Sequence, residues 1–525
     1  MAKRLCELSR DANRQIGLLV DRLGQVDKVI VGDAHQIFIP ELGRSRAGRG
    51  RLRGLRLIVT HLRGEPLNKD NLTDLSLLRL DAVVVVQADI RGLSGAVEVA
   101  HLLPATHPSN EMWKVDLYHS VHKWEGHFLK FIQELEGELT REIKGISSDD
   151  RPRAILVGVS SSTKEGALSI SELQRLANTA GLQVAESVLQ TRKRQDGRTY
   201  VGKGKLQDIL LRSMHQEADV LIFDDELSPS QLRNIATDTN LKVLDRTQLI
   251  LDIFAQRAKT REGKLQVELA QLRYRRPRLA MMPTAMSRLT GGIGGRGPGE
   301  TKLEVNRRRA DERLKRIEKQ LQKLGRDRDL RRQRRKKVGL PLVSIVGYTN
   351  AGKSTLLNTM TMSKVDAEDK LFATLDPTSR RMRFPSEREV ILTDTVGFIR
   401  DLPKDLIEAF RSTLEEVVEA DLLLHVIDAN SEEAESHITS VETVLKDLGA
   451  DKTPTIRVLN KIDEVDVNDW DDVKMRLNGK LCSAQTGEGL EPLLLLIQQK
   501  LFHQKAKDQI KSKTARKKPR WKESS

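Results

Sequence analysis

The stretch Gly347-Tyr-Thr-Asn-Ala-Gly-Lys353-Ser354 decides the fold of the chain around it. It follows the apolar run 342–346 and precedes 355–360, so a glycine-rich turn joins an expected buried strand to an expected helix. In that context the backbone N–H groups can surround the α- and β-phosphates of a nucleotide. Lys353 can then reach the β- and γ-phosphates, and the Ser354 hydroxyl can bind Mg²⁺. We therefore predict a phosphate-binding loop.

The string Asp394-Thr-Val-Gly397 follows an expected strand that ends at its acidic residue. A carboxylate at that position can hold Mg²⁺ through a water molecule, and the Gly397 N–H can meet a γ-phosphate, so the next loop can sense hydrolysis. The segment 371–378 lies between this string and the phosphate loop, where a first switch belongs. We expect Thr374 to be the second protein ligand of Mg²⁺, with Thr378 as the alternative.

Two further strings select the base. Asn460-Lys-Ile-Asp463 follows another apolar run, and the Asp463 carboxylate can accept both the N1–H and the N2–H₂ of guanine. Adenine offers no such pair, so we predict GTP as the nucleotide. Ser483-Ala-Gln-Thr-Gly487 supplies, near Ala484, the backbone N–H that commonly contacts the guanine carbonyl.

These strings define the predicted site. We expect nucleotide contacts from Gly347, Tyr348, Thr349, Asn350, Ala351, Gly352, Lys353, Ser354, Thr355, Asp394, Gly397, Asn460, Lys461, Asp463, Ser483 and Ala484. The expected Mg²⁺ ligands are Ser354, Thr374 and, through water, Asp394. Catalysis is assigned to Lys353, Thr374 and Gly397.

Two residues bear on the rate of hydrolysis. Ras-like enzymes carry a water-orienting Gln directly after the glycine of the Asp-x-x-Gly string, whereas this chain has Phe398, which cannot polarise water. We therefore predict slow unassisted hydrolysis, with the catalytic group supplied by a switch backbone, an ion or a partner. Asn350 resembles a potassium ligand found in some GTPases that lack the Gln, and a turn-stabilising amide is an equal alternative.

The composition indicates a protein with a polyanionic partner. The 525 residues carry a formal net charge of +15 with a pI near 9.6, which favours RNA or an acidic surface, and we expect no DNA binding. The two cysteines, Cys6 and Cys482, argue against a disulfide framework or a Cys-based zinc site. No apolar run is long enough to span a membrane and no signal-peptide pattern is present, so we expect a cytoplasmic monomer.

Composition and periodicity divide the chain into five segments. Residues 1–150 read as an α/β or α+β extension of unknown role, and 151–258 as a small parallel α/β domain. A basic helical hairpin is expected over 259–338, the GTP-binding domain with a mostly parallel sheet over 339–502, and a basic disordered tail over 503–525. The predicted fold class is therefore multidomain α/β.

The extension contains an Arg- and Gly-rich loop, 43–54, which could lie along phosphates or be a solvated loop. His61 and Asp74 have no further close ligand at a recognised spacing, so we expect no metal there. In the small domain, Tyr200-Val-Gly-Lys-Gly-Lys205 precedes an expected helix. It could contact RNA phosphate through that helix N-terminus, although a plain turn is as plausible and ATP binding is a weak claim. The acids of 223–226 could bind a metal but more often cap the next helix.

The hairpin prediction rests on apolar spacing. Leu265, Leu269 and Leu272 mark one stripe, and a heptad seam follows at Ala310, Leu314, Ile317, Leu321 and Leu324. The glycine-rich stretch 290–301 separates them, which favours an antiparallel hairpin over a free coiled-coil dimer. Basic clusters at 273–278, 307–309 and 331–337 decorate both arms and favour a surface that faces nucleic acid.

Over roughly 151–502 the chain resembles HflX-type ribosome-associated GTPases. The strings that carry the resemblance are Tyr200–Lys205, Phe223-Asp-Asp-Glu-Leu-Ser-Pro229, Gly297-Pro-Gly-Glu-Thr301 and Phe372-Ala-Thr-Leu-Asp-Pro377. Phe398 also fits, since members of the family lack the glutamine. The resemblance implies binding to the large ribosomal subunit near the peptidyl-transferase centre, hydrolysis stimulated by ribosomes, and splitting or rescue of stalled ribosomes. The N-terminal extension looks like one carried by long-form members.

Three functions are therefore compared. The first is a GTP-hydrolysing switch on the large ribosomal subunit and its RNA. The second is a GTP-regulated protein that binds or remodels RNA in general and shows no preference for that subunit. The third, an ATP-driven helicase that uses the 151–258 domain, is disfavoured because that domain lacks a proper phosphate loop.

Overall fold

The computed structural model describes residues 1–40, 42, 51–89, 91–104, 107, 111–123, 127–146, 151–239, 241–279, 302–361, 371–372, 378–384, 387–400 and 403–502. The chain forms two compact units. The first comprises Met1–Ala177 and Gly181–Leu244, and the second comprises Asn178–Ala180 and Asp245–Ser525. Helix α7, which follows the small α/β domain in sequence, thus belongs to the second unit.

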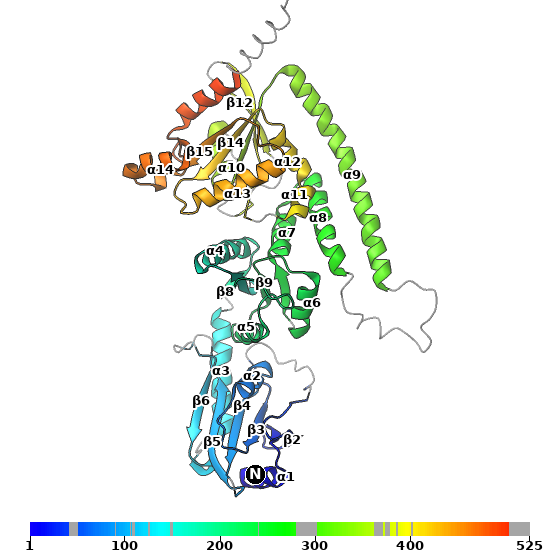
Figure 1. The fold of residues 1–525 in the computed structure, drawn as a ribbon, viewed down its shortest axis with the longest axis vertical. Helices are drawn as coiled ribbons and strands as arrows, with labels where there is room; N and C mark the ends of the chain where they lie inside the picture. Colours follow the sequence, from blue (N-terminus) through cyan, green and yellow to red (C-terminus); the bar gives the residue numbers. More distant parts are fainter. Residues whose placement is uncertain are drawn as a thin grey trace, which may run out of the picture. The chain divides into compact units, whose positions relative to one another are not determined.

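The first unit begins with a six-stranded sheet in the order β2-β1-β3-β4-β5-β6 (Figure 1). Only β3 and β4 pair in parallel; the other neighbours are antiparallel. One face buries Leu57 and Val85 with Leu75 of α2, and the other buries Val84 and Val97 with Cys6 of α1. The elements are α1 (Ala2–Ala12), β1 (Ile16–Asp21), β2 (Val26–Val31), β3 (Leu55–His61), α2 (Lys69–Leu77), β4 (Ala82–Ala88), β5 (Ser94–Leu102), β6 (Trp113–Tyr118), η1 (Val121–Lys123) and α3 (Phe128–Ile146).

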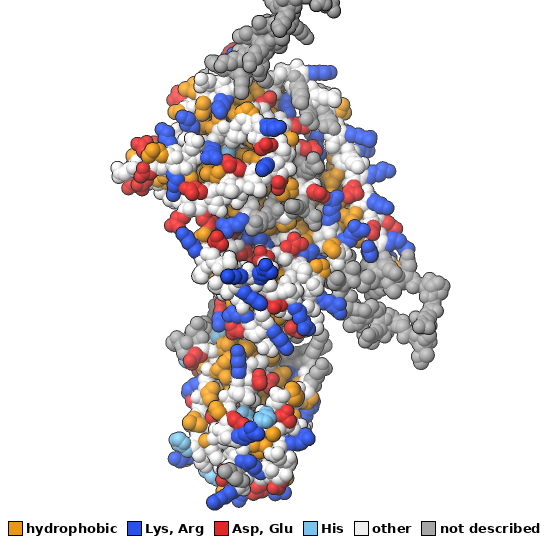
Figure 2. Space-filling model, in the orientation of Figure 1, with side chains coloured by type: hydrophobic (Ala, Val, Ile, Leu, Met, Phe, Trp, Pro, Cys, Tyr) orange, Lys and Arg blue, Asp and Glu red, His pale blue; other side chains and the backbone are white. Residues whose placement is uncertain are grey.

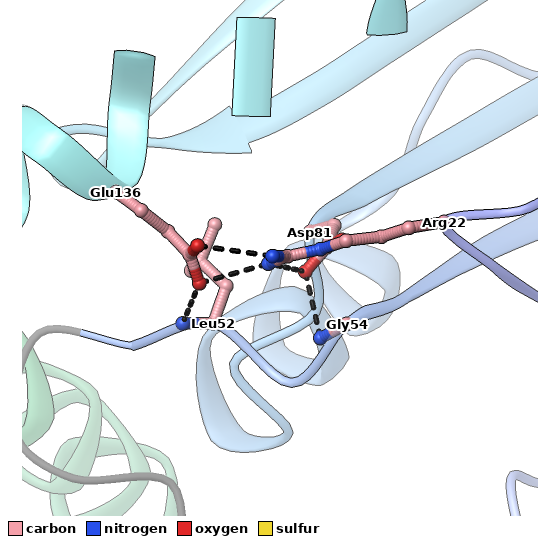
Figure 3. Close-up of polar contacts among 5 residues, drawn as sticks. All are labelled: Arg22, Leu52, Gly54, Asp81 and Glu136. Carbon is pink, nitrogen blue, oxygen red and sulfur yellow. Dashed lines mark hydrogen bonds and ion pairs between the residues drawn. The ribbon is translucent and has the colours of Figure 1, made fainter. Parts of the chain in front are cut away.

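A partly buried ion network ties α3 to this sheet (Figure 3). The fully buried Asp81 binds Arg22 at 2.6 Å, and Glu136 of α3 binds the same guanidinium at 2.8 Å. The backbone N–H groups of Gly54 and Leu52 donate to Asp81 and Glu136, each at 2.9 Å. Hydrogen bonds to the two carboxylates raise the pKa of Arg22 above its ordinary value. The network therefore holds both α3 and the chain just before β3.

The second sheet of this unit has the order β10-β9-β7-β8, with β7 parallel to both β8 and β9. The middle of β7, residues 154–157, is apolar and buried, as is typical of an inner strand of a parallel sheet. The elements are β7 (Arg153–Ser160), α4 (Thr163–Thr179), β8 (Gln183–Thr191), α5 (Lys203–His215), β9 (Val220–Phe223), α6 (Pro229–Asp238) and β10 (Lys242–Asp245). Strands and helices alternate along this segment, as in the small parallel α/β domain that the sequence predicts.

The second unit opens with α7 (Arg246–Arg257), α8 (Arg261–Leu279) and α9 (Lys302–Val338). Helices α8 and α9 run antiparallel, because Glu262 pairs with Arg328 whereas Glu268, further along α8, pairs with Arg313, earlier on α9. Their seam buries the predicted stripe, namely Leu265, Leu269, Leu314 and Ile317, with Leu272, Leu321 and Leu324 against it. The predicted hairpin is therefore present within one chain.

The remaining domain is built on a sheet in the order β12-β13-β11-β14-β15-β16, parallel except for β12. Its core contains apolar residues from β11, β13, β14 and β15. The elements are β11 (Leu342–Gly347), α10 (Lys353–Thr361), β12 (Thr378–Arg383), β13 (Glu389–Asp394), α11 (Lys404–Ala409), α12 (Arg411–Val418), β14 (Leu422–Asp428), α13 (Ala434–Asp447), β15 (Thr455–Asn460), η3 (Ile462–Glu464), η4 (Val467–Asp469), α14 (Trp470–Leu477), β16 (Lys480–Leu481) and a last helix over 490–502. This parallel sheet places the predicted strings at the carboxyl ends of β11, β13 and β15.

Candidate functional site

The phosphate loop joins β11 to α10 as predicted. Gly347 and Gly352 have φ values of 154° and 88°, which favour glycine. Both also lie too close to neighbours to bear a side chain, because a Cβ would overlap the Val426 carbonyl or the Asn460 amide. Asn350, at φ 65°, adopts the left-handed conformation that asparagine tolerates better than most residues. The glycines are thus required by close packing of the loop as well as by phosphate access.

Lys353 lies at the start of α10 with its side chain buried. Its Nζ donates to the Tyr348 carbonyl at 2.7 Å, which holds the ammonium group beside the loop. Burial lowers the pKa of Lys353 to about 8, and the nearby Asp394 carboxylate opposes that shift. A bound phosphate would favour the charged form in the same way, so the position suits a phosphate ligand.

Two of the predicted Mg²⁺ ligands, Ser354 and Asp394, are in direct contact. Ser354 Oγ donates to Asp394 Oδ2 at 2.6 Å, and Asp394 is fully buried at the end of β13. Thr378, the alternative switch ligand, pairs with Asp394 in the β12–β13 register. Hydroxyl and carboxylate oxygens are the ligands that Mg²⁺ prefers, so these residues fit the ion.

The loop after Asp394 is hydrogen-bonded directly onto the phosphate loop. Phe398 N donates to Gly347 O at 3.1 Å, and Thr349 N donates to Phe398 O at 2.8 Å, which forms a short parallel bridge. A Cβ on Gly397 would lie 2.7 Å from Thr349 Cγ2 and 3.0 Å from Lys353 Nζ. The Phe398 side chain is 1% exposed. A buried apolar ring thus follows Gly397, where Ras-like enzymes place their glutamine.

The predicted guanine-binding strings meet at one buried amide. Asn460 Nδ2 donates to Ala351 O at 2.8 Å, and Asn460 Oδ1 accepts from Ala484 N at 2.8 Å. Asn460 therefore links the phosphate loop to the loop after β16. Asp463 is exposed in η3, where its carboxylate can accept from a base. Lys461 pairs with Asp428 at 2.7 Å.

One backbone group has a partner that the sequence did not predict. The Ala484 N–H, which the sequence predicts to contact the guanine carbonyl, donates to Asn460 Oδ1 at 2.8 Å. Ser483 is buried and receives the Thr486 N–H on its hydroxyl at 3.0 Å, so it shapes the loop. Thr355 lies in the first turn of α10, next to Ser354. The structure thus brings the described candidates to one edge of the sheet.

Several predicted features lie outside the described residues. They are Thr374 with the rest of 373–377, the glycine-rich stretch 290–301, the basic tail 503–525 and most of the Arg- and Gly-rich loop 43–54.

An aromatic cluster next to the site was not predicted. Phe254 of α7 meets Phe372 and Phe410 edge to face, with ring centroids 4.7 Å and 4.9 Å apart, and all three side chains are buried. Phe372 belongs to the first switch segment and has φ 57°, a strained value for a bulky residue. Phe410 lies between α11 and α12, near the end of 394–411, the segment that we take as the second switch. No spacing rule relates residues this far apart in sequence.

In the small domain, Tyr200 fills the place where a parallel sheet usually binds ligands. The strand order reverses between β7 and β9, and the Tyr200 side chain is fully buried there. Its hydroxyl donates to Asp225 at 2.5 Å and accepts from Val159 N at 3.3 Å. The Tyr200 side chain is therefore a core group and cannot contact RNA.

The expectation that the acids of 223–226 cap the next helix was wrong. Ser228 is the N-cap of α6, and it exchanges capping-box hydrogen bonds with Gln231. Asp225 instead holds the Tyr200 loop, because it accepts from Tyr200 and from Gln195. Among the described residues no group of three or more His, Cys, Asp or Glu side chains could hold a metal ion. Within the same residues, no helix is both long and apolar enough to cross a membrane.

The glycine loop with Lys353 and Ser354, the acid at the end of β13 and the guanine strings after β15 and β16 define a P-loop GTPase. Three family models match the chain. They are described as GTP-binding GTPase N-terminal over residues 167–255, GTP-binding GTPase Middle Region over 257–335, and 50S ribosome-binding GTPase over 342–461.

Curated relatives narrow the class. The GTPase HflX of Caldanaerobacter subterraneus subsp. tengcongensis is 53% identical over 354 residues, which cover 67% of this chain and 81% of the relative. The GTPase HflX of Escherichia coli is 44% identical over 358 residues, which cover 67% of this chain and 84% of that relative. A GTP-binding protein from Sulfolobus solfataricus, solved in complex with GDP, is 26% identical with a TM-score of 0.37, covering 67% and 99%. The chain belongs to the HflX family of GTPases and hydrolyses GTP.

The Asn460 link generates a prediction. Asn460→Ala removes two buried hydrogen bonds and leaves Ala351 O and Ala484 N unpaired, so GDP affinity should fall by about 2–4 kcal/mol, or roughly 30- to 1,000-fold in Kd. Titration with a fluorescent GDP analogue measures the loss. The control is Asn468→Ala, which changes an exposed asparagine at η4. An Asn460→Ala protein with unchanged Kd would show that the link does not hold the site together.

Proposed function

We propose that this GTPase is a molecular switch that binds the large ribosomal subunit and its RNA, and that it splits or rescues stalled ribosomes. The observation that carries the proposal is the basic α8–α9 hairpin, which is joined by ion pairs to α11 and to the end of α12. The match to the model described as 50S ribosome-binding GTPase supports the same partner. The first 150 residues contain equal numbers of basic and acidic side chains, so the net positive charge belongs to the rest of the chain.

The basic residues of the hairpin include two groups that differ in what they face. One group faces the GTP-binding domain: Arg273 pairs with Glu408 at 3.2 Å, and Arg335 pairs with Glu419 at 3.6 Å. The other group is exposed, and Figure 2 shows Lys and Arg side chains along α9. These exposed cations are Arg261, Lys264, Arg275, Arg276, Arg307, Arg308, Arg309, Lys315, Arg316, Lys319, Lys323, Arg326 and Lys337. Two of them have ion pairs within the hairpin, Arg276 with Asp311 and Arg308 with Glu312. Exposed cations along one hairpin suit the phosphates of structured RNA.

An aromatic cluster connects α7, the helix that precedes the hairpin, with both predicted switch segments. The Phe254 ring of α7 contacts two other rings. One is Phe372, which precedes the predicted Mg²⁺ ligand Thr374 in sequence, and the other is Phe410, near the end of the second switch. Thr374 lies two positions after Phe372, a reach of about 7 Å at most. A first switch that moves toward Mg²⁺ and the γ-phosphate would therefore pull on the cluster. GTP would thus favour one arrangement of the hairpin on RNA, and hydrolysis would release it.

The chemistry rests on few side chains. Lys353 would hold the β- and γ-phosphates, Gly397 N–H would meet the γ-phosphate, and Asn460 with Asp463 would hold the base. Ser354, Asp394 and either Thr374 or Thr378 would hold Mg²⁺, which offsets charge on the phosphate oxygens when bound. Because Phe398 is buried and apolar, none of its atoms except the backbone can orient water. Slow hydrolysis without a partner is the expected consequence.

The partner is tested by GTP hydrolysis in K⁺ buffer with and without purified large ribosomal subunits, with Lys353→Ala as the blank. Partners that complete a GTPase site raise kcat by about 10³–10⁵, so a rise of at least about tenfold is expected. An equal mass of generic structured RNA should stimulate far less. Equal stimulation by any RNA, or none by subunits, would instead favour a general RNA-binding GTPase. ATP hydrolysis that survives Lys353→Ala would point to the small domain.

The coupling is tested with Phe254→Leu. Two aromatic pairs are worth about 1–3 kcal/mol together, so their loss should weaken the link between the switches and α7–α8. Hydrogen exchange of α8 amides should differ between the GDP and GMPPNP states of the parent protein, and the variant should lose most of that difference. Phe384→Leu is the matched control, since Phe384 is buried in the same domain outside the cluster. If Phe254→Leu kept the full difference in α8 exchange between the GDP and GMPPNP states, the cluster would not couple the switches to α7–α8.

The potassium proposal is tested by replacing Na⁺ with K⁺. If Asn350 binds K⁺, the intrinsic rate should rise steeply in K⁺, and Asn350→Gly should abolish the rise. Glycine is the informative replacement, because it accepts φ 65° and removes only the amide. Equal rates in the two salts would leave Asn350 as a turn-stabilising residue. The exposed Asn430→Ala serves as control.

A further inference from the structure

Tyr348, the second residue of the phosphate loop, uses three separate groups to contact three parts of the site. Its carbonyl accepts from Lys353 Nζ at 2.7 Å. Its hydroxyl accepts from the backbone N–H of Arg400 at 2.8 Å. Its ring stacks on His437 of α13, with centroids 3.8 Å apart and planes 16° apart. The side chain is 7% exposed, so these contacts are shielded from water.

The partners of Tyr348 form a closed ring of contacts. Arg400 pairs with Glu433 at 3.6 Å, and Glu433 pairs with His437 at 3.3 Å. His437 then stacks back on Tyr348. The four residues come from the phosphate loop, the second switch loop and the start of α13. This closed set of contacts therefore fixes the position of the Tyr348 hydroxyl relative to the switch backbone.

The hydroxyl contact matters because of what the switch loop lacks. Phe398 has no polar side chain, so Gly397 and Phe398 can act on the γ-phosphate and on water only through their backbone. That backbone is held by the Phe398 bonds to Gly347 and Thr349 on one side. On the other side, the Arg400 N–H is held by Tyr348. Loss of the second hold would let the Gly397 N–H sample more directions.

We propose that Tyr348 is a positioning residue for GTP hydrolysis, which acts by fixing the backbone of 397–400 through its hydroxyl. GDP, which has no γ-phosphate, would gain nothing from this contact. The hydroxyl should therefore matter for the rate of the chemical step and not for the affinity for GDP.

The test is Tyr348→Phe, which keeps the ring on His437 and removes only the hydroxyl. The single-turnover rate of GTP hydrolysis, measured without ribosomes in Mg²⁺ and K⁺ buffer, should fall about three- to tenfold, the effect of one hydrogen bond. The Kd for GDP should stay within about twofold of the parent value. The control is Tyr118→Phe, a hydroxyl loss in the N-terminal sheet, which should leave rate and affinity unchanged.

Two outcomes would overturn the assignment. An unchanged hydrolysis rate in Tyr348→Phe would show that the Arg400 contact has no part in the reaction. A fall in GDP affinity as large as the fall in rate would show that Tyr348 supports the loop in general rather than the chemical step. Because the assay uses GTP alone, neither outcome depends on whether the ribosome is the partner.

Discussion

Two backbone hydrogen bonds between the phosphate loop and the second switch loop are the contact on which the site depends. Phe398 donates to Gly347 and accepts from Thr349, which places Gly397 against Lys353 and Thr349. Tyr348, between those two partners, then reaches Arg400, whose carbonyl accepts from Arg246 of α7 at 3.5 Å. The nucleotide-binding backbone, the switch and the helix that leads into the hairpin are therefore linked within a few residues.

The hairpin shows how one residue type can serve two purposes. Arginines on its inner side meet Glu408 and Glu419 of the switch-proximal helices. Glu416 of α12 is partly buried, and this burial raises its pKa. Other arginines pair across the hairpin itself: Arg276 with Asp311 at 2.8 Å, and Arg313 with Glu268 at 2.7 Å. The same residue type thus attaches the hairpin to the GTP-binding domain and holds its two helices together.

Much of the fold and site could be predicted, because the signals are local. The phosphate loop, the acid after β13 and the guanine strings lie at strand ends, and a parallel sheet brings such ends to one edge. The hairpin followed from heptad spacing. The error concerns a group whose partner lies far away in sequence: Asp225 accepts from Tyr200 rather than capping α6. Such choices depend on which neighbour the fold supplies.

The sequence by itself determined the nucleotide, the order of the elements, the seam of the hairpin and the absence of a catalytic glutamine. Residue type and short-range spacing suffice for these, since phosphate, base and heptad contacts each need particular groups at fixed intervals. Only the tertiary structure decided that Phe254, Phe372 and Phe410 form one cluster and that the Tyr348 hydroxyl holds the switch. The physical reason is that packing selects partners by shape and burial, which no local pattern encodes.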